Sequence, residues 1–580
     1  MNRKQRRATI KHGSRAVAHS SASDGSQINK LFVEALQFES AGKLNDAVRT
    51  YKRVLSLKPD HAEACNNLAR TLQNLGAKKD ASSFYARALA LMPQLLQQYA
   101  GICATLVSLL PELDRALRLQ AATWPKKLSE AELFGDTGLA AIADDPLLLY
   151  VLQSTPVRDV TFERLLTALR ASLLNDVVAA KSISETVLGF ACTLARQCFI
   201  NEYVFATTPD EDAQVERLKR TLGDNVASAD GVQLAVFAMY FPLHTLPAAS
   251  ALLARRWPPA IQDLFTQQIR EPAQEKELRD SIPRLTAIED EVSQKVRQQY
   301  EENPYPRWLH VAGQVTPTAI DRYLRDQFPA AAFAPLGKTE ALDMLIAGCG
   351  TGQVAIATAQ KYLGVRALAI DLSLSSLSYA KRMTPADLTA RIEYAQADIL
   401  KLASIGRSFD VVDACGVLHH MADPLEGWRI LLGLLRPGGL MHLAFYSDAG
   451  RNDVAAARAF IAERGYGSTP AEIRRCREDL LKTPLASVTR FNDFFATSEC
   501  RDLLFHVHET RVNIPIIKGF IAEHGLKFIG FEFDQPILQR SRAEFAAAGW
   551  SLADLDRWHD IEMKYPDTFS GMYQFWVQKA

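Results

Sequence analysis

The chain has 580 residues, which predicts roughly three to five structural units at ~100–200 residues per domain. It carries 66 Lys and Arg residues and 66 Asp and Glu residues, and this neutral balance argues against binding nucleic acid through an overall basic surface. Hydrophobic residues make up 48% and charged residues 23%, which excludes global disorder and a collagen-like architecture. The longest apolar candidate, Val232 to Leu243, is shorter than the ~18 residues of a membrane span, so we expect no membrane insertion.

The first residues are basic, with six Lys or Arg and no acidic residue among the first 23. They lack the apolar stretch of a secretory signal, so we predict a disordered basic tail over residues 1–25. A tail that contacts RNA or an acidic partner is the alternative interpretation.

Eight cysteines are scattered without a Cys-x-x-Cys pair, which indicates neither a zinc ribbon nor a disulfide framework. A reducing, cytoplasmic location follows from that usage.

An internal repeat occupies residues 27–93. Six residue pairs recur at an offset of 34: Gly42 and Gly76, Ala47 and Ala81, Tyr51 and Tyr85, Leu55 and Leu89, Leu57 and Leu91, and Pro59 and Pro93. That offset is the period of the tetratricopeptide (TPR) repeat, a helix–turn–helix unit. We therefore expect TPR-like helical repeats over residues 26–125. Two roles stay open: a concave surface for a protein or peptide, and a structural cap for the region that follows.

Residues 126–290 are rich in Ala and Leu, with apolar positions at helical spacing and few strand signals. We predict a helical middle domain without a catalytic constellation.

The pattern changes after about residue 335, where short apolar runs alternate with helical stretches. The runs cover residues 341–347, 365–370, 392–395, 409–414 and 440–445. This alternation predicts a parallel sheet, and the overall fold class is therefore helical (α) followed by α/β.

Polar or small residues stand where four of these strands end: Gly348, Asp371, Asp398 and Cys415. Ligands of parallel sheets bind beyond the carboxyl ends of the strands, so we expect these residues in one crevice. The glycines at 348, 350 and 352 form G-x-G-x-G, which is neither the G-x-G-x-x-G dinucleotide fingerprint nor a phosphate loop with a lysine. Asp371 follows 19 residues after Gly352, and its carboxylate can accept hydrogen bonds from both hydroxyl groups of a ribose. An adenosine ligand without a phosphate cradle fits this pattern.

Taken together, these motifs resemble the class I S-adenosylmethionine-dependent methyltransferases. The matching stretches are IAGCGTGQ (346–353), Asp371, QADIL (396–400), FDVVDACGVLHHMADP (409–424) and LLRPGG (434–439). The resemblance implies a Rossmann-like seven-stranded sheet, whose last two strands we place at residues 526–533 and 572–577. It implies the cofactor S-adenosyl-L-methionine, with its methionine tail near Gly348, Gly350 and Gly352, its ribose on Asp371 and its adenine near Asp398 and Ile399. Cys415 would be a small residue packed beside the cofactor.

The segment QYEENPYPRW (299–308) precedes the sheet and resembles bacterial proteins that fuse TPR repeats to a methyltransferase. The resemblance implies a methyltransferase domain over residues 291–580, with its core at about 335–447 and 526–580 and an insertion at about 448–525. A second insertion, at about 534–570, would lie between the last two strands. Tyr300 would lie near the cofactor carboxylate, or within a packed linker. The resemblance does not identify the acceptor of the methyl group.

The catalytic residues are not identified by any motif. His419, His420 and Tyr446 are weak candidates, because the histidines follow the fourth strand and the tyrosine ends the fifth. The motifs of amino-methylating DNA enzymes and of cytosine C5 enzymes are missing after the fourth strand. His506, His508 and Glu509 do not have a recognised metal spacing, so we predict that they form an acceptor-side polar network with Arg501 and Asp502 and bind no metal.

The leading hypothesis is methyl transfer from S-adenosylmethionine to a protein recruited by the repeats. A small metabolite or sugar acceptor is the main alternative within the enzyme class. A repeat scaffold with a cofactor-binding but inactive methyltransferase fold is the hypothesis from a different class. Neither a membrane nor a nucleic-acid partner is expected.

Overall fold

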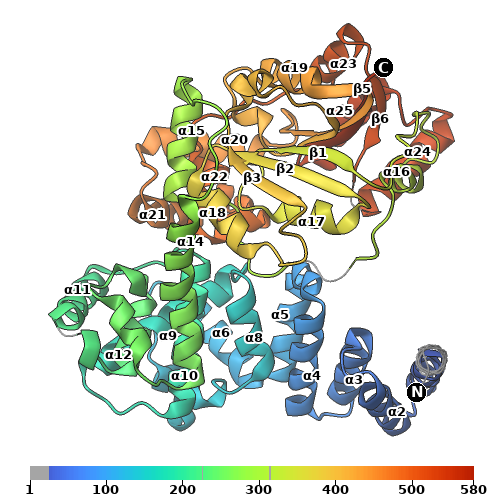
Figure 1. Ribbon diagram of the computed structural model, residues 1–580. Helices are drawn as coiled ribbons and strands as arrows, with labels where there is room; N and C mark the ends of the chain where they lie inside the picture. Colours follow the sequence, from blue (N-terminus) through green and yellow to red (C-terminus); the bar gives the residue numbers. More distant parts are fainter. Residues whose placement is uncertain (1–24, 225, 312–314, 534) are drawn as a thin grey trace, which may run out of the picture. The chain divides into compact units, whose positions relative to one another are not determined.

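The computed structural model describes residues 25–224, 226–311, 315–533 and 535–580 (Figure 1). The predicted basic tail, up to residue 24, lies outside the described residues. Two compact units divide the chain, one formed by Met1–Gln197 with Asp230–Val236 and the other by Cys198–Ala229 with Phe237–Ala580. The division falls inside the segment predicted as a middle domain, and the domain boundaries at residues 125 and 290 stay a prediction.

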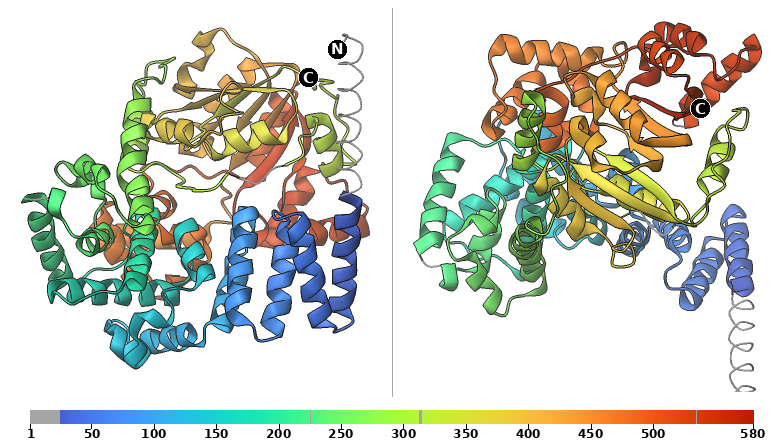
Figure 2. Two further views of the ribbon diagram at one scale, coloured as in Figure 1. Left: turned by 60° about the horizontal axis from the view of Figure 1, so that its bottom comes forward. Right: turned by 45° about the horizontal axis from the view of Figure 1, so that its top comes forward.

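The first unit begins with antiparallel helical hairpins, seen side by side in blue in Figure 2. Residues 25–40 are helical and are followed by α2 (Leu44–Leu57), α3 (Ala62–Asn74), α4 (Lys78–Leu91), α5 (Tyr99–Leu109) and α6 (Pro111–Thr123). Gly42 and Gly76, 34 residues apart, take φ of +71° and +77°, a backbone conformation that glycine adopts without strain. The hydrogen bond from the Tyr51 hydroxyl to Glu39 recurs as the bond from Tyr85 to Gln73, each 2.8 Å long. The repeat is therefore structural as well as sequential.

The rest of the first unit is helical, as predicted. It contains α7 (Glu130–Phe134), α8 (Pro146–Ser154), α9 (Val160–Val178), most of α10 (Glu185–Ile200) and most of α12 (Gly231–Ala238). The second unit contributes α11 (Pro209–Asp224), α13 (Pro259–Phe265), α14 (Glu271–Arg279) and α15 (Glu291–Glu302) before its sheet begins. None of the described helices combines the length and the apolar character needed to cross a membrane.

The second unit is built on a seven-stranded sheet with the strand order β3-β2-β1-β4-β5-β7-β6. The strands are β1 (Leu342–Ala347), β2 (Val365–Asp371), β3 (Ile392–Gln396), β4 (Phe409–Ala414), β5 (Leu435–Phe445), β6 (Lys527–Phe531) and β7 (Tyr573–Gln578). The first five are parallel, and β7 runs antiparallel between β5 and β6. All seven predicted strands are present, although β5 starts five residues early, across a register shift opposite Phe409 and Val411.

Alternating residues of the central strands face two separate apolar cores. Leu345 and Leu368 face a core that includes Trp428 of α19 (Pro424–Leu434) and Phe520 of α23 (Ile514–Glu523). Their neighbours Met344 and Ala369 face the other core, which is covered by α16 (Ile320–Gln327), α17 (Gln353–Lys361) and α18 (Leu374–Met383). Because both faces are covered, the strands read as nearly continuous apolar runs, as expected of a parallel sheet.

The predicted insertions are helical. Between β5 and β6 lie α20 (Asn452–Arg464), α21 (Pro470–Leu480), α22 (Thr497–Phe505) and α23, and between β6 and β7 lie α24 (Gln535–Ala548) and α25 (Leu555–Lys564). Residues just after α10 bond to the first insertion: the Thr497 amide donates to the Asn201 carbonyl, and Arg477 donates to the Val204 carbonyl, both at 3.1 Å. These bonds fix α21 and α22, and α22 carries Asp502, which lines the site described next.

Candidate active site

A pocket with a cavity of about 200 Å³ opens at the carboxyl ends of the parallel strands. Five strand-end residues line it: Gly348 after β1, Asp371 at the end of β2, Asp398 after β3, Cys415 after β4 and Tyr446 after β5. Parallel strands place their carboxyl ends at one edge, so residues up to a hundred positions apart in the chain converge. The structure thus brings together the crevice that the sequence predicts.

Asp371 is held in place by backbone groups. Its two carboxylate oxygens accept hydrogen bonds from the amides of Gly350 and Ser373, each 2.9 Å long. Burial raises the pKa of Asp371 to about 6, and the two amide bonds partly oppose that rise. The group is therefore mostly ionised at neutral pH. Each oxygen keeps a second lone pair, so the carboxylate can accept hydrogen bonds from a vicinal diol.

Asp398 is buried and begins a short 3₁₀ helix, where one of its oxygens accepts a bond from the Leu400 amide at 3.0 Å. Its other oxygen, Oδ2, is buried and has no hydrogen-bond partner within the described structure. Burial raises the pKa of this carboxyl. Asp398 and Ile399 both line the pocket, so a ligand N–H group there would pair with an otherwise unsatisfied acceptor.

The three motif glycines all have positive φ, at +73° for Gly348, +51° for Gly350 and +84° for Gly352. A Cβ atom on them would lie 2.5 Å from the Val417 side chain, 2.7 Å from the Tyr305 carbonyl and 2.5 Å from the Ala380 Cβ, respectively. Neighbouring protein atoms therefore occupy the space that a side chain would need. Gly348 and Gly350 line the pocket, whereas Gly352 caps α17 outside the lining.

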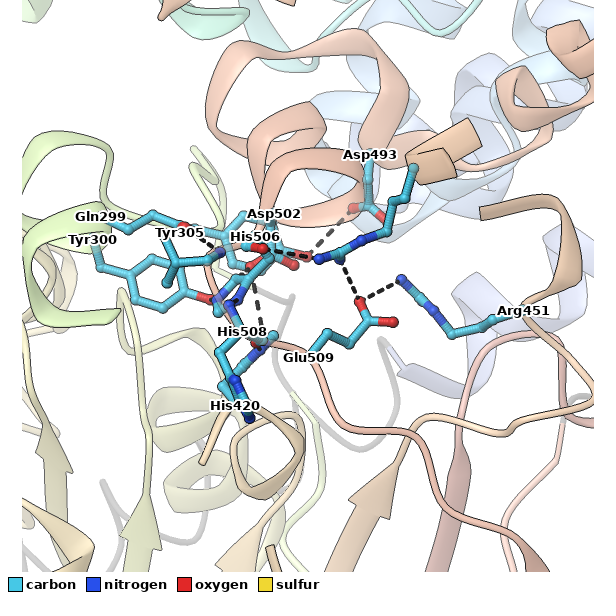
Figure 3. Close-up of polar contacts among 12 residues, drawn as sticks. Gln299, Tyr300, Tyr305, His420, Arg451, Asp493, Asp502, His506, His508 and Glu509 are labelled. Carbon is cyan, nitrogen blue, oxygen red and sulfur yellow. Dashed lines mark hydrogen bonds and ion pairs between the residues drawn. The ribbon is translucent and has the colours of Figure 1, made fainter. Parts of the chain in front are cut away.

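Tyr300 lines the pocket, but its hydroxyl group points toward the insertion between β5 and β6 (Figure 3). It donates a hydrogen bond to Asp502 Oδ1 at 2.5 Å and lies 3.2 Å from His506 Nε2. Asp502 is buried and also lines the pocket. Burial raises the pKa of Asp502, and nearby His420 opposes that rise. The tyrosine hydroxyl thus belongs to a polar cluster with Asp502 and His506.

The two adjacent histidines have different positions. His420 lines the pocket, and its Nδ1 donates to the His508 carbonyl at 3.1 Å. His419 is completely buried outside the lining, with its ring centroid 3.8 Å from that of Tyr446. Burial lowers the pKa of both histidines, and Asp502 partly opposes the effect at His420. Of the pair, His420 is therefore placed to meet a ligand, whereas His419 supports the Tyr446 ring.

Two arginines contact Glu509 and Tyr446. The Arg451 guanidinium lies 3.6 Å from the centre of the Tyr446 ring and 3.3 Å from Glu509, which also pairs with Arg458 at 3.1 Å. Glu509 is thus engaged in ion pairs, and His508 Nε2 lies 3.2 Å from the Thr510 hydroxyl. A polar network is thus present in this stretch, and its place beside an acceptor stays a prediction. Arg501 does not join it and pairs with Glu302 instead.

Cys415 lies beside a buried ion pair. Its Sγ is 3.2 Å from Nδ1 of His442, and the same nitrogen is 3.0 Å from Asp413 Oδ2. Burial raises the pKa of the thiol well above its ordinary value, so the sulfur remains protonated. At His442, burial lowers the pKa but Asp413 outweighs it and raises the pKa. These properties fit a packing role for Cys415 better than a nucleophile.

Some lining residues were not predicted from the sequence. Ser293 and Val296 come from α15, and Met572 stands just before β7. The motif at residues 299–308 points to the end of α15, and helical periodicity could have extended that prediction back from Tyr300 by one turn to Val296 and by two turns to Ser293. Met572 follows a predicted insertion and has no local signal.

The comparisons with known proteins agree with this geometry. A family profile described as a methyltransferase domain matches residues 345–441, and one described as a tetratricopeptide repeat matches residues 39–106. Residues 345–441 are a methyltransferase domain. This confirms the predicted family resemblance, the fold class and S-adenosylmethionine as the cofactor of the methyltransferase domain.

The curated relatives cover only part of the chain. An uncharacterized protein of Synechococcus is 29% identical over 271 residues, which are 43% of this chain and 62% of that protein. The ubiquinone biosynthesis O-methyltransferase of Paracidovorax citrulli is 31% identical over 159 residues, 27% of this chain and 63% of the enzyme. The chain thus spans less than two thirds of the length of either relative.

A solved structure described as PKMT2 from Rickettsia typhi in complex with AdoHcy is 16% identical, with a TM-score of 0.35, over 45% of this chain and 53% of that one.

The pocket of the methyltransferase domain has the chemistry that S-adenosylmethionine requires. The unpaired Asp398 oxygen suits an adenine amino group, and the ionised Asp371 suits the two ribose hydroxyls. The orphaned acceptor is the more telling of the two features, because a buried oxygen without a partner is costly unless a ligand supplies one.

Proposed function

We propose that this protein transfers a methyl group from S-adenosylmethionine to a nucleophile that enters beside Tyr300, His420, Tyr446 and Asp502. The observation that carries the proposal is the composition of one pocket. Residues suited to a nucleoside lie at its Asp371–Asp398 end, and a cluster of titratable side chains lines the same cavity. A cofactor site joined to a proton-accepting group is what a methyl transfer needs.

The cofactor-binding roles follow from the geometry of each residue. Asp371 would accept the ribose hydroxyls, Asp398 Oδ2 would accept the adenine amino group, and Ile399 would pack against the base. Gly348 and Gly350 would lie along the methionine tail, with Cys415 packed nearby. Gly352 would act through the fold of the loop, because it stands outside the lining.

His420 is the proposed general base. The bond from its Nδ1 to the His508 carbonyl requires a proton on Nδ1, so the neutral ring keeps its lone pair on Nε2. Nε2 lies 4.0 Å from Asp502 Oδ1, close enough for the carboxylate to stabilise a charged ring. When bound, S-adenosylmethionine supplies an electrophilic methyl group on a sulfonium. The acceptor would lose its proton to His420 as it forms the new bond.

The acceptor could be delivered in two ways. The TPR repeats support a protein or peptide acceptor, because stacked helical hairpins form extended binding surfaces. The similarity to ubiquinone biosynthesis O-methyltransferases supports a small-molecule acceptor instead. We propose protein recruitment in the cytoplasm as the first function to test, with the small-molecule reaction as the second.

Calorimetric titration of S-adenosylmethionine into the full chain tests the cofactor site. We expect micromolar affinity in the wild type and a loss of at least tenfold in Asp371→Ala, since hydrogen bonds to a charged group contribute about 1.5–3 kcal/mol. Asp387→Ala, at an exposed position between α18 and β3, is the matched control and should bind as the wild type does. A folded wild type that does not bind the cofactor would favour the scaffold hypothesis.

A further inference from the structure

The acceptor end of the pocket presents two hydrogen-bond acceptors at a defined spacing. His420 Nε2 and Asp502 Oδ1 lie 4.0 Å apart, and both residues line the cavity. This distance is too long for a direct hydrogen bond. An atom placed about 2.9 Å from each of them would instead bridge the two. The spacing therefore suits one polar atom of a ligand that bonds to both groups.

The surrounding hydrogen bonds fix what each group can offer. The His508 amide donates to His506 Nδ1 at 3.1 Å, so the proton of the neutral His506 ring is on Nε2. That proton points to the Tyr300 oxygen, and the Tyr300 hydroxyl in turn donates to Asp502. Asp502 Oδ1 keeps one lone pair for a ligand. This arrangement also leaves His506 Nε2 without a lone pair for a metal ion, although His420, Asp502 and His506 lie close enough to form a ligand set.

The number of hydrogens on the bridging atom distinguishes the chemical classes of methyl acceptor that could bind here. A hydroxyl group has one hydrogen and can donate it to His420 Nε2 or to the remaining lone pair of Asp502 Oδ1, but not to both. A primary amine has two hydrogens when neutral, one for each acceptor, and its lone pair remains free for the methyl group. Tyr300, Tyr305 and Tyr446 also line the pocket. Aromatic faces next to a carboxylate are suited to bind an ammonium group.

We infer that the methyl acceptor is an alkyl amine held between His420 Nε2 and Asp502 Oδ1. The inference rests on the proposed function and names its substrate class. In the step, the amine nitrogen uses its lone pair to bond the methyl carbon. The S–C bond breaks and its electron pair stays on sulfur. One N–H proton passes to His420 Nε2, while the other N–H remains bonded to Asp502. The products are a methylated amine, S-adenosylhomocysteine and protonated His420, which then releases its proton to solvent.

The binding test uses two probes of equal heavy-atom count, n-hexylamine and n-hexanol, titrated into the full chain saturated with S-adenosylhomocysteine. We expect hexylamine to bind at least tenfold more tightly than hexanol. The preference should shrink to threefold or less in Asp502→Asn. Glu302→Gln is the matched control, because its carboxylate lies two residues from Tyr300 but is half exposed and pairs with Arg501. It should keep the full preference.

A second test identifies the source of the amine. Bacterial extract is separated into protein and small-molecule fractions, half of each is treated with an amine-acetylating reagent, and all are incubated with the enzyme and methyl-labelled S-adenosylmethionine. Label that disappears after acetylation supports an amine, and the fraction that carries it distinguishes a protein side chain from a free amine. Label that survives acetylation overturns the inference.

The two proposals fail in different ways. A chain that binds S-adenosylhomocysteine but binds hexanol as well as hexylamine, or neither probe, overturns the amine inference and leaves methyl transfer standing. A folded chain that does not bind S-adenosylhomocysteine overturns the proposed function itself. A preference for hexylamine that persists in Asp502→Asn overturns the assignment of Asp502 as a partner of the amine.

Discussion

The substitution Gly352→Ala separates a packing role from a ligand-binding role in the glycine motif. An alanine at this φ of +84° costs about 1–2 kcal/mol in backbone strain. Its Cβ would lie 2.5 Å from the Cβ of Ala380 in α18, and such overpacking costs a further ~1–3 kcal/mol. The free energy of unfolding of the sheet should therefore fall by about 2–5 kcal/mol. Because Gly352 stands outside the pocket lining, the affinity of the folded protein for S-adenosylmethionine should change by less than about threefold, under 0.7 kcal/mol.

The assay is urea unfolding followed by tryptophan fluorescence, since Trp428 and Trp576 are buried on the two faces of the sheet. Ala380→Gly is the partner variant in a double-mutant cycle. It removes the overlapping methyl group but leaves the backbone strain, so we expect a coupling energy of about 1–3 kcal/mol. Additive effects of the two substitutions would refute the packing argument. A large loss of affinity at unchanged stability would restore a direct binding role for Gly352.

Three further predictions concern the pocket. Affinity for S-adenosylmethionine should fall by up to tenfold per pH unit below about pH 6, because the ribose hydroxyls bind the ionised form of Asp371. Below that pH, cofactor binding should therefore release a proton. Calorimetry between pH 5 and 7.5 in two buffers of different ionisation enthalpy measures both effects. His420→Gln should lower kcat by about 100-fold or more at unchanged cofactor affinity, whereas His419→Gln should mainly lower stability, and a kcat unaffected in His420→Gln would contradict the base assignment. Asp398→Ala should weaken cofactor binding by about tenfold or more, and Ile399→Ala by less than Asp398→Ala, in the same titration; the reverse order would contradict the adenine assignment.

Local patterns were enough to predict the repeats and the strands. The 34-residue offset that relates Gly42 to Gly76 directly gives the hairpin spacing, because each repeat is a complete structural unit. The apolar runs of β1 to β4 were found because strands buried on both faces carry no alternation to obscure them. The predicted start of β5 was wrong. The sequence from Arg436 to Gly439 is typical of a loop, whereas in the structure the strand already begins at Leu435 and continues through a register shift.

The acceptor end was harder to predict, because its geometry depends on contacts distant in sequence. His419 and His420 are neighbours with the same chemistry, and only the packing against Tyr446 and the bond to His508 distinguish them. The hydrogen bond from Tyr300 to Asp502 joins residues 202 positions apart. Such a pairing follows from how α22 and α15 fold against the strand ends, which no local pattern encodes.

The position of β7 has a consequence for the order in which the nascent chain folds. β6 leaves the ribosome before β7, which is its one neighbour in the described sheet, and β7 also pairs with the free side of β5. Until residues 573–578 emerge, two strand edges therefore remain open, and open edges favour pairing with other chains. The helices α24 and α25, which are synthesised in between, pack Phe545 and Trp558 into the same apolar core as Phe531 of β6. We expect them to shield β6 during co-translational folding, so that a chain arrested before β7 would depend on these two helices, or on a chaperone, to stay monomeric.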